Sequence, residues 1–562
     1  MLDIKFKKFL PFIFIILVGI IPLFDLFHSG LPLTHDGQDH AARIANFYTS
    51  LSEGILIPRW AGNLNWGFGH PILMFLYPLP SYFASLFHFL GFSLINSLKI
   101  VFGLTFIASG IAMFLWVRKL LGELGGIFAA ILYMFAPYRF VNLYVRGAIG
   151  EHVSFMFVPL VLFFITKLFL DKKHSPFNKY LISAGVSLST AGLILSHNAL
   201  SILFLSFTFF YALVISIYKK DKKNLILSFA GIIFGFLLSA FFWLPAFIEG
   251  KYTLRDIVTG GGEYSGRFVE PFRLFMPEWS YGITGQLSVQ IGLVHLILIV
   301  ISIYAVIKLT KKDLLIKRIY VLGFSFFLIS LFMMIKESDF IWRTVTTLQK
   351  FQFPWRFLSL TVLTSSFIAA YAVLIFRRKE KIIFGMAVLL LSIIVFYGGY
   401  FRAKDYLVKD DSFFERVYYG TTDTGESGPI WSVRFMEKEA DSSIEVISGK
   451  AIVQEVFRSS TRHEYTISAE TKTRIKENTL YFPGWNVYVD GRKLDVNSEI
   501  EFQDPKNRGL ITFHVDKGAH NIKLLFEDTK FRIFSNYLSL LSLVVLVLLG
   551  FYFYKKNEYY KK

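Results

Sequence analysis

The sequence predicts a polytopic membrane protein: all-α in the bilayer, with about 12 transmembrane helices, and an extracytoplasmic β-sandwich domain before the last helix. Three observations predict this fold class. First, 54% of the 562 residues are hydrophobic, whereas a soluble domain averages roughly 45–50%. Second, apolar runs of about 20 residues, the length that crosses a bilayer core, recur along most of the chain. Third, residues 402–532 combine ordinary charge density with alternating apolar positions.

The transmembrane helices are expected where long apolar runs stand between charged segments. Their approximate ranges are 9–27, 95–117, 122–138, 153–170, 180–197, 199–218, 224–245, 287–307, 319–335, 357–376, 382–401 and 533–554. We expect the first to remain as a helix and not to be cleaved as a signal peptide. Its apolar run is long, and no small-residue cleavage site follows it before Pro32.

Short basic clusters beside these spans predict the orientation of the chain. They are Lys5/Lys7/Lys8, Arg118/Lys119, Lys172/Lys173, Lys219/Lys220/Lys222/Lys223, Lys311/Lys312/Lys317/Arg318, Arg377/Arg378/Lys379 and Lys555/Lys556. An N-terminus in the cytoplasm places every cluster on the cytoplasmic side, as the positive-inside rule requires. We therefore expect a multi-pass plasma-membrane protein with both termini cytoplasmic. Because these clusters carry much of the net charge of +18, we expect no nucleic-acid partner.

The chain divides into three expected parts. Residues 1–401 form the membrane domain, with an outer loop at 28–94; residues 402–532 form the extracytoplasmic β-rich domain, and 533–562 the final helix and cytoplasmic tail. Within the outer loop, the prolines of segment 71–91 break its first half, which favours an amphipathic helix on the membrane surface over a further span.

Two compositional features refine these parts. In the β-rich domain, turn signals such as Asp490-Gly491 separate runs that alternate with period two, such as 511–515. The chain has no cysteine, which excludes disulfides, a thiolate nucleophile and cysteine-ligated zinc.

The first outer loop carries an acidic motif directly after a membrane exit. His35, Asp36, Asp39 and His40 fall within six residues, and Arg43 follows. In a helix that begins near Asp36, the spacing places Asp36, Asp39, His40 and Arg43 on one face. A carboxylate there can act as a general base or help to hold a divalent cation such as Mg²⁺ or Mn²⁺. The structural alternative is that Asp36 caps the helix and Asp39 pairs with Arg43.

A second candidate group lies between the third and fourth spans, where Arg146 and Glu151 stand just outside an apolar helix. Arginine suits phosphate because its fork meets two phosphate oxygens at once. The alternative is an Arg146–Glu151 ion pair that pins the loop.

A third group stands at the mouth of the tenth span, where Arg356 lies among aromatic residues in the string 351–357. Arg356 can bind a phosphate or stack on a ring. An interfacial aromatic belt with a snorkelling arginine explains the same string without a site.

Two histidines complete the candidate residues. His197, at the outer turn between the fifth and sixth spans, can line the same site or simply satisfy the turn. His295 falls near the middle of the eighth span, where we expect a neutral imidazole bonded to a neighbouring helix.

Four strings carry a family resemblance: His35–His40, Arg146–Glu151, Gln352–Phe357 and Tyr481–Trp485 with Val489–Gly491. With the acidic loop, the surface helix and the many spans, the chain resembles the GT-C superfamily of membrane glycosyltransferases. It is more closely similar to bacterial proteins of the YfhO type and to those labelled 6-pyruvoyl-tetrahydropterin synthase-related membrane proteins. The resemblance implies a hexosyl- or pentosyltransferase of GT-C-like fold that moves a sugar from a polyprenyl-phosphate carrier to an envelope glycan, lipid or protein.

The resemblance also implies roles for individual residues. Asp36 would be the catalytic carboxylate, activating the acceptor hydroxyl or organising a metal, with Asp39 in support. Arg146 or Arg356 would stabilise the leaving lipid phosphate. The other expected members of the substrate site are His35, His40, Glu151 and His197. The acidic motif departs from a plain Asp-x-Asp pair, which leaves metal dependence open.

Two other classes of function remain open. A lipid-linked glycan flippase or transporter would carry polar groups and broken helices near the bilayer midplane, where His295 stands apart among otherwise apolar spans. A non-enzymatic membrane scaffold would use the β-sandwich as a binding module, and would tolerate Asp36→Asn.

Overall fold

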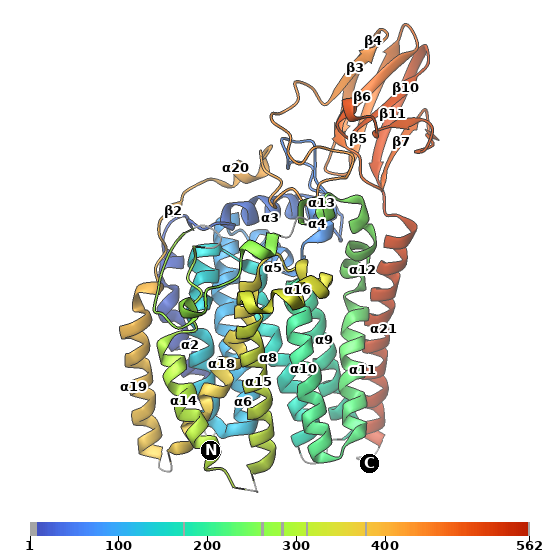
Figure 1. The fold of residues 1–562 in the computed structure, drawn as a ribbon. Coiled ribbons are helices and arrows are strands. Elements are labelled where there is room, and N and C mark those ends of the chain that lie inside the picture. The colour runs from blue at the N-terminus through green and yellow to red at the C-terminus, as the bar shows by residue number, and fades with distance from the viewer. Residues whose placement is uncertain are drawn as a thin grey trace.

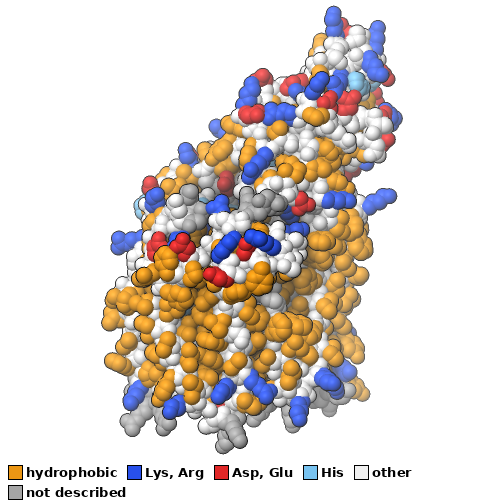
Figure 2. Space-filling view, in the orientation of Figure 1, with side chains coloured by type: hydrophobic (Ala, Val, Ile, Leu, Met, Phe, Trp, Pro, Cys, Tyr) orange, Lys and Arg blue, Asp and Glu red, His pale blue; other side chains and the backbone are white. Residues whose placement is uncertain are grey.

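The protein is described by a computed structural model that covers residues 8–171, 175–259, 263–282, 286–310, 313–376 and 379–559. A helical bundle carries a β-domain on one end, and both marked chain ends lie at the opposite end (Figure 1). A belt of hydrophobic side chains surrounds the bundle, with Lys and Arg at the end away from the β-domain (Figure 2). The assignment of that end to the cytoplasm remains a prediction. Eight residues of the basic clusters lie outside the described ranges: Lys5, Lys7, Lys172, Lys173, Lys311, Lys312, Arg377 and Arg378.

Helices long and apolar enough to cross a membrane make up the bundle, and the described residues contain nine of them. They are Leu10–Phe27 (α2 and η1), Leu94–Met134 (α6), Ile149–Leu170 (α8), Pro176–Ser196 (α9), Asn198–Lys219 (α10), Leu314–Phe332 (α15), Pro354–Ile375 (around α18, Leu358–Ala370), Lys381–Tyr400 (in α19, Lys379–Tyr397, and η10) and Lys530–Tyr559 (α21). A tenth span is the pair Lys222–Leu238 (α11) and Ala240–Tyr252 (α12, Ala240–Glu249, and η3), bent by 68°.

The long helix α6 is a hairpin of two predicted spans. Gly122 has φ 76° and ψ 179°, a conformation that ends a helix and that glycine adopts without strain. The two arms pack closely, since a Cβ on Gly110 would lie 2.4 Å from the Met134 sulfur. With the shorter helix Leu293–Ile307 (α14) at the eighth position, every one of the predicted spans has a helix.

The outer end of the bundle is covered by short helices. α3 (Gly37–Ser52) follows the acidic motif, and α4 (Ile72–Phe75) and α5 (Leu79–Phe89) fall in the predicted surface segment. α5 has 11 residues, too few for the roughly 20 that a span needs, and it packs on α3 and α6. The surface helix predicted from the proline pattern is therefore present.

The β-domain is a sandwich of two antiparallel sheets that share one core. One sheet has the order β3-β6-β10-β9 and the other β4-β5-β11-β7-β8. The strands are β3 (Ile444–Ser448), β4 (Ala451–Arg458), β5 (Arg462–Ala469), β6 (Thr473–Leu480), β7 (Trp485–Val489), β8 (Arg492–Lys493), β9 (Ile500–Glu501), β10 (Leu510–Val515) and β11 (Gly518–Phe526). Ile475 and Phe513 of the first sheet meet Ile467 and Leu524 of the second in that core.

The predicted Asp490-Gly491 turn joins β7 to β8, with φ of 51° and 82° as a two-residue hairpin turn requires. The sandwich strands begin at Ile444, later than the predicted domain start at 402. The intervening chain runs over the bundle: β2 (Tyr406–Leu407) pairs with β1 (Leu31–Pro32), and α20 (Asp411–Glu415) packs on α3.

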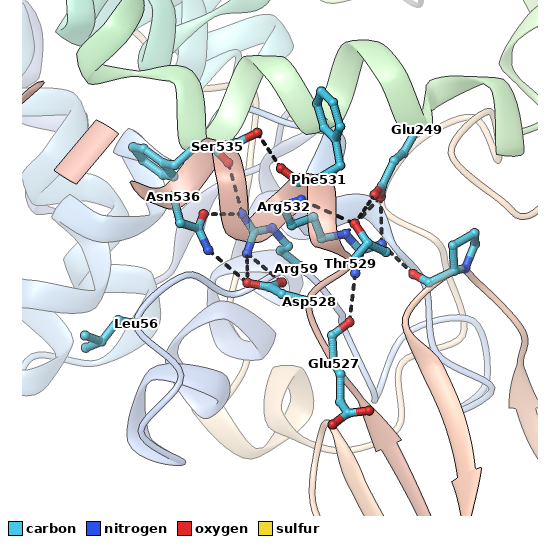
Figure 3. A network of polar contacts seen from close by, with 12 residues as sticks. Leu56, Arg59, Glu249, Glu527, Asp528, Thr529, Phe531, Arg532, Ser535 and Asn536 are labelled. Carbon is cyan, nitrogen blue, oxygen red and sulfur yellow. Dashed lines mark hydrogen bonds and ion pairs between the residues drawn. The ribbon is translucent and has the colours of Figure 1, made fainter. Parts of the chain in front are cut away.

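A polar network ties the β-domain, α12 and α21 together where the last helix enters the bundle (Figure 3). Arg59 donates from Nη1 to both carboxylate oxygens of Asp528, at 2.8 and 2.9 Å, and from Nη2 to Asn536 Oδ1 at 2.8 Å. Arg532 donates to Glu249 Oε2 from Nε at 2.9 Å and from Nη2 at 2.7 Å. The Arg532 side chain is fully buried, so this junction depends on charges that water does not screen.

Candidate functional site

The acidic motif and the Arg146 loop, predicted as separate groups, are joined by their backbones. His35 N donates to Val145 O at 3.0 Å, and Asp36 N donates to Arg146 O at 2.9 Å. Gly147 has φ +70°, and a Cβ on it would lie 2.4 Å from Thr34 Oγ1. The close approach of the two loops therefore needs glycine at this position.

Asp36 carries an exposed carboxylate at the start of α3. It occupies the cap position, but its side chain makes no cap hydrogen bond, and Thr34 Oγ1 accepts from Gly37 N at 3.1 Å. The structural alternative, in which the Asp36 side chain caps the helix, is therefore wrong. The Asp36 carboxylate is also close enough to Arg146 to stabilise its charged form.

Asp39 faces a segment that lies 379 residues further along the chain. Its Oδ1 accepts from the Tyr418 hydroxyl at 2.8 Å, and Gln38 Nε2 donates to the same hydroxyl at 2.9 Å. Burial raises the pKa of the Asp39 carboxyl, while Tyr418 and Arg43 oppose the shift. The alternative of an Asp39–Arg43 ion pair is not observed, because the Arg43 guanidinium donates to His40 and to Thr422.

Arg43 and His40 form a buried pair on α3. Arg43 Nη1 donates to His40 Nδ1 at 2.9 Å, and Arg43 Nε donates to Thr422 Oγ1 at 3.2 Å. Burial lowers the pKa of His40, and the charges of Arg43 and Arg146 lower it further. His40 is therefore a neutral acceptor that orients Arg43. His35 differs from His40, because the buried Nε2 of His35 has no hydrogen-bond partner.

Arg146 and Glu151 form the structural ion pair that the sequence left open. Arg146 Nη1 lies 2.8 Å from Glu151 Oε1 and also donates to Asn142 Oδ1 at 2.7 Å. Glu151, 1% exposed, accepts on Oε2 from Tyr138 at 3.0 Å and Asn142 at 3.1 Å. The Arg146 guanidinium also stacks on the Trp355 ring at 4.6 Å. Its charge is thus already compensated within the protein.

Arg356 lies beside that pair but is not neutralised in the same way. It is close enough to Glu151 and Arg146 for their charges to act on it. Its guanidinium sits 5.2 Å over the Phe353 ring, and its buried Nε has no hydrogen-bond partner. Arg356 is therefore the arginine of this cluster whose charge no ion pair among the described residues compensates.

Tyr77, between α4 and α5, lies beside these groups, because a Cβ on Gly150 would lie 2.2 Å from its ring. The charges of Asp36, Arg43, Glu151 and Arg356 are close enough to act on its hydroxyl. We call Asp36, Tyr77, Arg146, Glu151 and Arg356 the outer cluster, since they gather at the end of the bundle that carries the β-domain.

The two remaining histidines have structural partners. His197 stacks on Tyr77 at 5.0 Å, and its Nδ1 accepts from Leu200 N at 3.3 Å, so it both borders the outer cluster and caps α10. His295 is buried and its Nε2 lies 3.0 Å from Leu132 O on a neighbouring helix. The prediction of a bonded intramembrane imidazole is confirmed for His295.

A covering segment that the sequence did not predict, residues 418–428, lies over α3 and contacts Asp39 and Arg43. Within it, Asp423 accepts from Gly425 N at 2.9 Å and Ser427 N at 3.0 Å, and Glu426 Oε2 accepts from Gln352 Nε2 at 3.0 Å. The run of polar residues with three glycines was its visible signal.

His70, also missed, lies fully buried beneath this segment, and neither ring nitrogen has a hydrogen-bond partner. Burial lowers its pKa and the charge of Asp423 opposes the shift.

Asp36 and Asp39 are the expected ligands of a divalent cation. Asp39 is already engaged with Tyr418, and among the described residues no group of three or more His, Asp or Glu side chains is placed to hold a metal. Asp36 and Asp39 alone do not fit a metal centre built by the protein.

Similar solved structures are membrane glycosyltransferases. The arabinofuranosyltransferase AftD from Mycobacteria has a TM-score of 0.48 at 14% identity, over 72% of this chain and 28% of its own. The Archaeoglobus fulgidus oligosaccharyltransferase with a tethered acceptor peptide has 0.45 at 13%, over 73% and 56%. ArnT from Cupriavidus metallidurans bound to undecaprenyl phosphate has 0.31 at 11%, over 66% and 77%.

The sequence of this chain also matches one relative and one family model. An uncharacterised protein of Lactococcus lactis subsp. cremoris (strain MG1363) is 29% identical over 252 residues. The match covers 43% of this chain and 40% of the relative, so the chain spans less than half of that protein. The model of the family described as 6-pyruvoyl-tetrahydropterin synthase related domain, membrane protein, matches residues 73–403, more than half of the 562 residues. The chain belongs to this family of membrane proteins.

Proposed function

We propose that this protein is a membrane glycosyltransferase that moves a sugar from a polyprenyl-phosphate-linked donor to an acceptor outside the cytoplasm. The observation that carries the proposal is the free guanidinium of Arg356 in the same cluster as the unpartnered carboxylate of Asp36. The two groups match the two charges of the reaction: a phosphate that leaves and a hydroxyl that loses a proton.

Arg356 is the proposed phosphate ligand. A lipid donor reaches the protein from within the bilayer, so its phosphate meets the protein at the membrane boundary. Arg356 lies in the first turn of the helical segment Pro354–Ile375, at the outer end of the bundle. Its unused donors can bind two phosphate oxygens, and burial strengthens that interaction. Arg146 supports this role by holding Glu151, which otherwise would place an uncompensated negative charge beside the phosphate.

Asp36 is the proposed general base. The oxygen of the acceptor hydroxyl attacks the anomeric carbon of the donor, and its proton passes to the Asp36 carboxylate. The bond between the anomeric carbon and the phosphate oxygen breaks, and its electron pair leaves with the polyprenyl phosphate. Asp39 is a positioning residue, since its contact with Tyr418 holds the covering segment over α3.

The test uses the full-length protein in proteoliposomes with a panel of polyprenyl-phosphate sugars and an oligosaccharide acceptor. Asp36→Asn should slow transfer by about 10²–10⁴-fold, and Arg356→Gln by about 10²–10³-fold. Asp256→Asn and Arg343→Gln are matched controls in the outer loops, and they should retain wild-type rates. Transfer that survives in Asp36→Asn and Arg356→Gln would overturn the assignment.

The same vesicles separate sugar transfer from the transport alternative. Wild-type protein that moves a labelled lipid-linked glycan between leaflets, and forms no new glycosidic bond with any donor, would refute the glycosyltransferase proposal. The bonded state of His295 already favours transfer, because an imidazole engaged by a neighbouring helix offers nothing to a passing substrate.

A further inference from the structure

We propose that a cleft between α3 and the β-domain binds one sugar unit of a glycan. We infer that this glycan is the acceptor of the sugar, and this inference rests on the proposed function. The cleft is distinct from the outer cluster and has a volume of about 240 Å³. That volume equals about eight water molecules at ~30 Å³ each, enough for one hexose ring with its hydroxyls.

Three parts of the chain build the cleft. Thr49 comes from the last turn of α3 and Glu53 directly follows that helix, Trp60 and Asn63 come from the outer loop, and the β4–β5 hairpin supplies the facing wall. Glu53 joins the walls, because its carboxylate oxygens accept from Ser460 N of that hairpin at 3.0 and 3.2 Å. The site therefore exists only when the β-domain is docked on the bundle.

The chemistry of the facing wall suits a sugar. His463, 3% exposed, lies with Nδ1 2.8 Å from Glu477 Oε1. Since a carboxylate only accepts, Nδ1 carries a proton and donates, which leaves Nε2 as the ring nitrogen that can bind a ligand. No hydrogen bond to another described residue occupies Nε2, so it can form a hydrogen bond with a ligand hydroxyl, which both donates and accepts. Arg458 Nη1 is held by Tyr465 at 2.8 Å and Glu477 at 3.0 Å, which fixes its remaining donors at the same wall.

The charge of the cleft favours a neutral ligand. Arg458 is compensated by Glu477, and the Glu53 carboxylate is engaged by the hairpin. Hydroxyl groups both donate and accept, so a wall that offers an imidazole nitrogen and a guanidinium matches a sugar better than an anion or a cation. Trp60, which is buried, also lines the cleft and contributes an apolar group to it.

The position of the cleft identifies the bound sugar as part of the acceptor. Asn46, which also lines it, stands seven residues after Asp39 and therefore on the same face of α3, about 10 Å further along the axis. Asn63 O accepts from Tyr418 N at 2.8 Å, and Tyr418 in turn holds Asp39. A glycan anchored here extends along α3 toward the acidic motif, while Arg356 lies in the separate cluster around Tyr77.

The binding test uses full-length protein in nanodiscs on a printed array of neutral and charged oligosaccharides and of unglycosylated peptides. Wild-type protein should bind neutral oligosaccharides. Ser459→Trp fills the cleft from the hairpin without touching Glu477, and should weaken binding by about tenfold or more, as expected when several hydrogen bonds are lost. Ser498→Trp, an exposed serine of the same domain outside the cleft, is the matched control and should bind like the wild type.

Binding does not require turnover, so this test separates the cleft from the proposed reaction. Equal glycan binding by Ser459→Trp and Ser498→Trp would overturn the proposal, as would binding of peptides alone or of no array member. Asp36→Asn should bind the array like the wild type even where it forms no product. In the transfer assay, Ser459→Trp should raise the KM for the acceptor and leave the KM for the lipid donor unchanged.

Discussion

The junction network of Figure 3 predicts that Arg532→Met will release the β-domain and the top of α21 from the bundle. Arg532 is 0% exposed and makes two hydrogen bonds to Glu249, itself 5% exposed, and another to Glu527 O at 3.4 Å. Removing one partner leaves the Glu249 charge buried without compensation. Such a loss costs about 3–5 kcal/mol. A methionine of similar length preserves most of the apolar contact, so the charge is the main change.

The assay is backbone hydrogen exchange across Thr529–Asn536 in the full-length protein, which reports the free energy of local opening. A loss of about 3–5 kcal/mol accelerates exchange by roughly two to more than three orders of magnitude. Arg343→Met is the control, because Arg343 pairs with Asp339 but is 70% exposed, and it should change stability by no more than about 1 kcal/mol.

A double variant completes the design. Glu249→Gln combined with Arg532→Met should recover part of the loss, because no uncompensated charge remains. Exchange in Arg532→Met that is no faster than in Arg343→Met would refute the reasoning that buried charge holds this junction.

Three further predictions concern the β-domain, the outer loop and the topology. Burial alone would raise the pKa of Glu477, but His463 and Arg458 hold that pKa at about 2. The stability that the Glu477 carboxylate provides should therefore be lost as the pH falls from about 4.5 to 2. Thermal unfolding measured against pH should show this loss, and Glu477→Gln should remove it. Gly69→Ala should lower the melting temperature more than Gly54→Ala, by an amount worth about 1–3 kcal/mol. Both glycines have positive φ, but a Cβ on Gly69 would lie 2.4 Å from Trp60 and one on Gly54 meets nothing within 4 Å; equal melting temperatures would contradict this packing. Because the chain has no cysteine, single cysteines can be labelled without background. A membrane-impermeant thiol reagent should label Leu56→Cys on intact cells and Asn557→Cys only after permeabilisation, and the reverse pattern would invert the predicted topology.

The helices of the bundle were predictable because each span corresponds to one continuous apolar run in the sequence. Even the turn inside α6 was visible, since the apolar pattern pauses near Gly122. Likewise the two-residue turn at Asp490-Gly491 depends only on local backbone preferences. Local physics therefore determines the spans and the strands.

The candidate site was predictable only in part, because its contacts are long-range. No local pattern indicates that Tyr418 donates to Asp39, or that Thr422 accepts a hydrogen bond from the Arg43 guanidinium. The composition of residues 402–443 resembles that of the β-domain, so the start of the strands at Ile444 was also hidden. Whether Arg146 or Arg356 stays free depended on Glu151, whose hydrogen bonds are set by the packing of the bundle.

The contact between Asp39 and Tyr418 has a consequence for biosynthesis. The two residues are 379 positions apart, and ribosomes add about 5–20 residues per second. Roughly 20–80 s therefore pass between the translation of Asp39 and the translation of Tyr418. A truncated product that lacks the chain beyond position 417 would leave the Asp39 carboxylate without its Tyr418 partner.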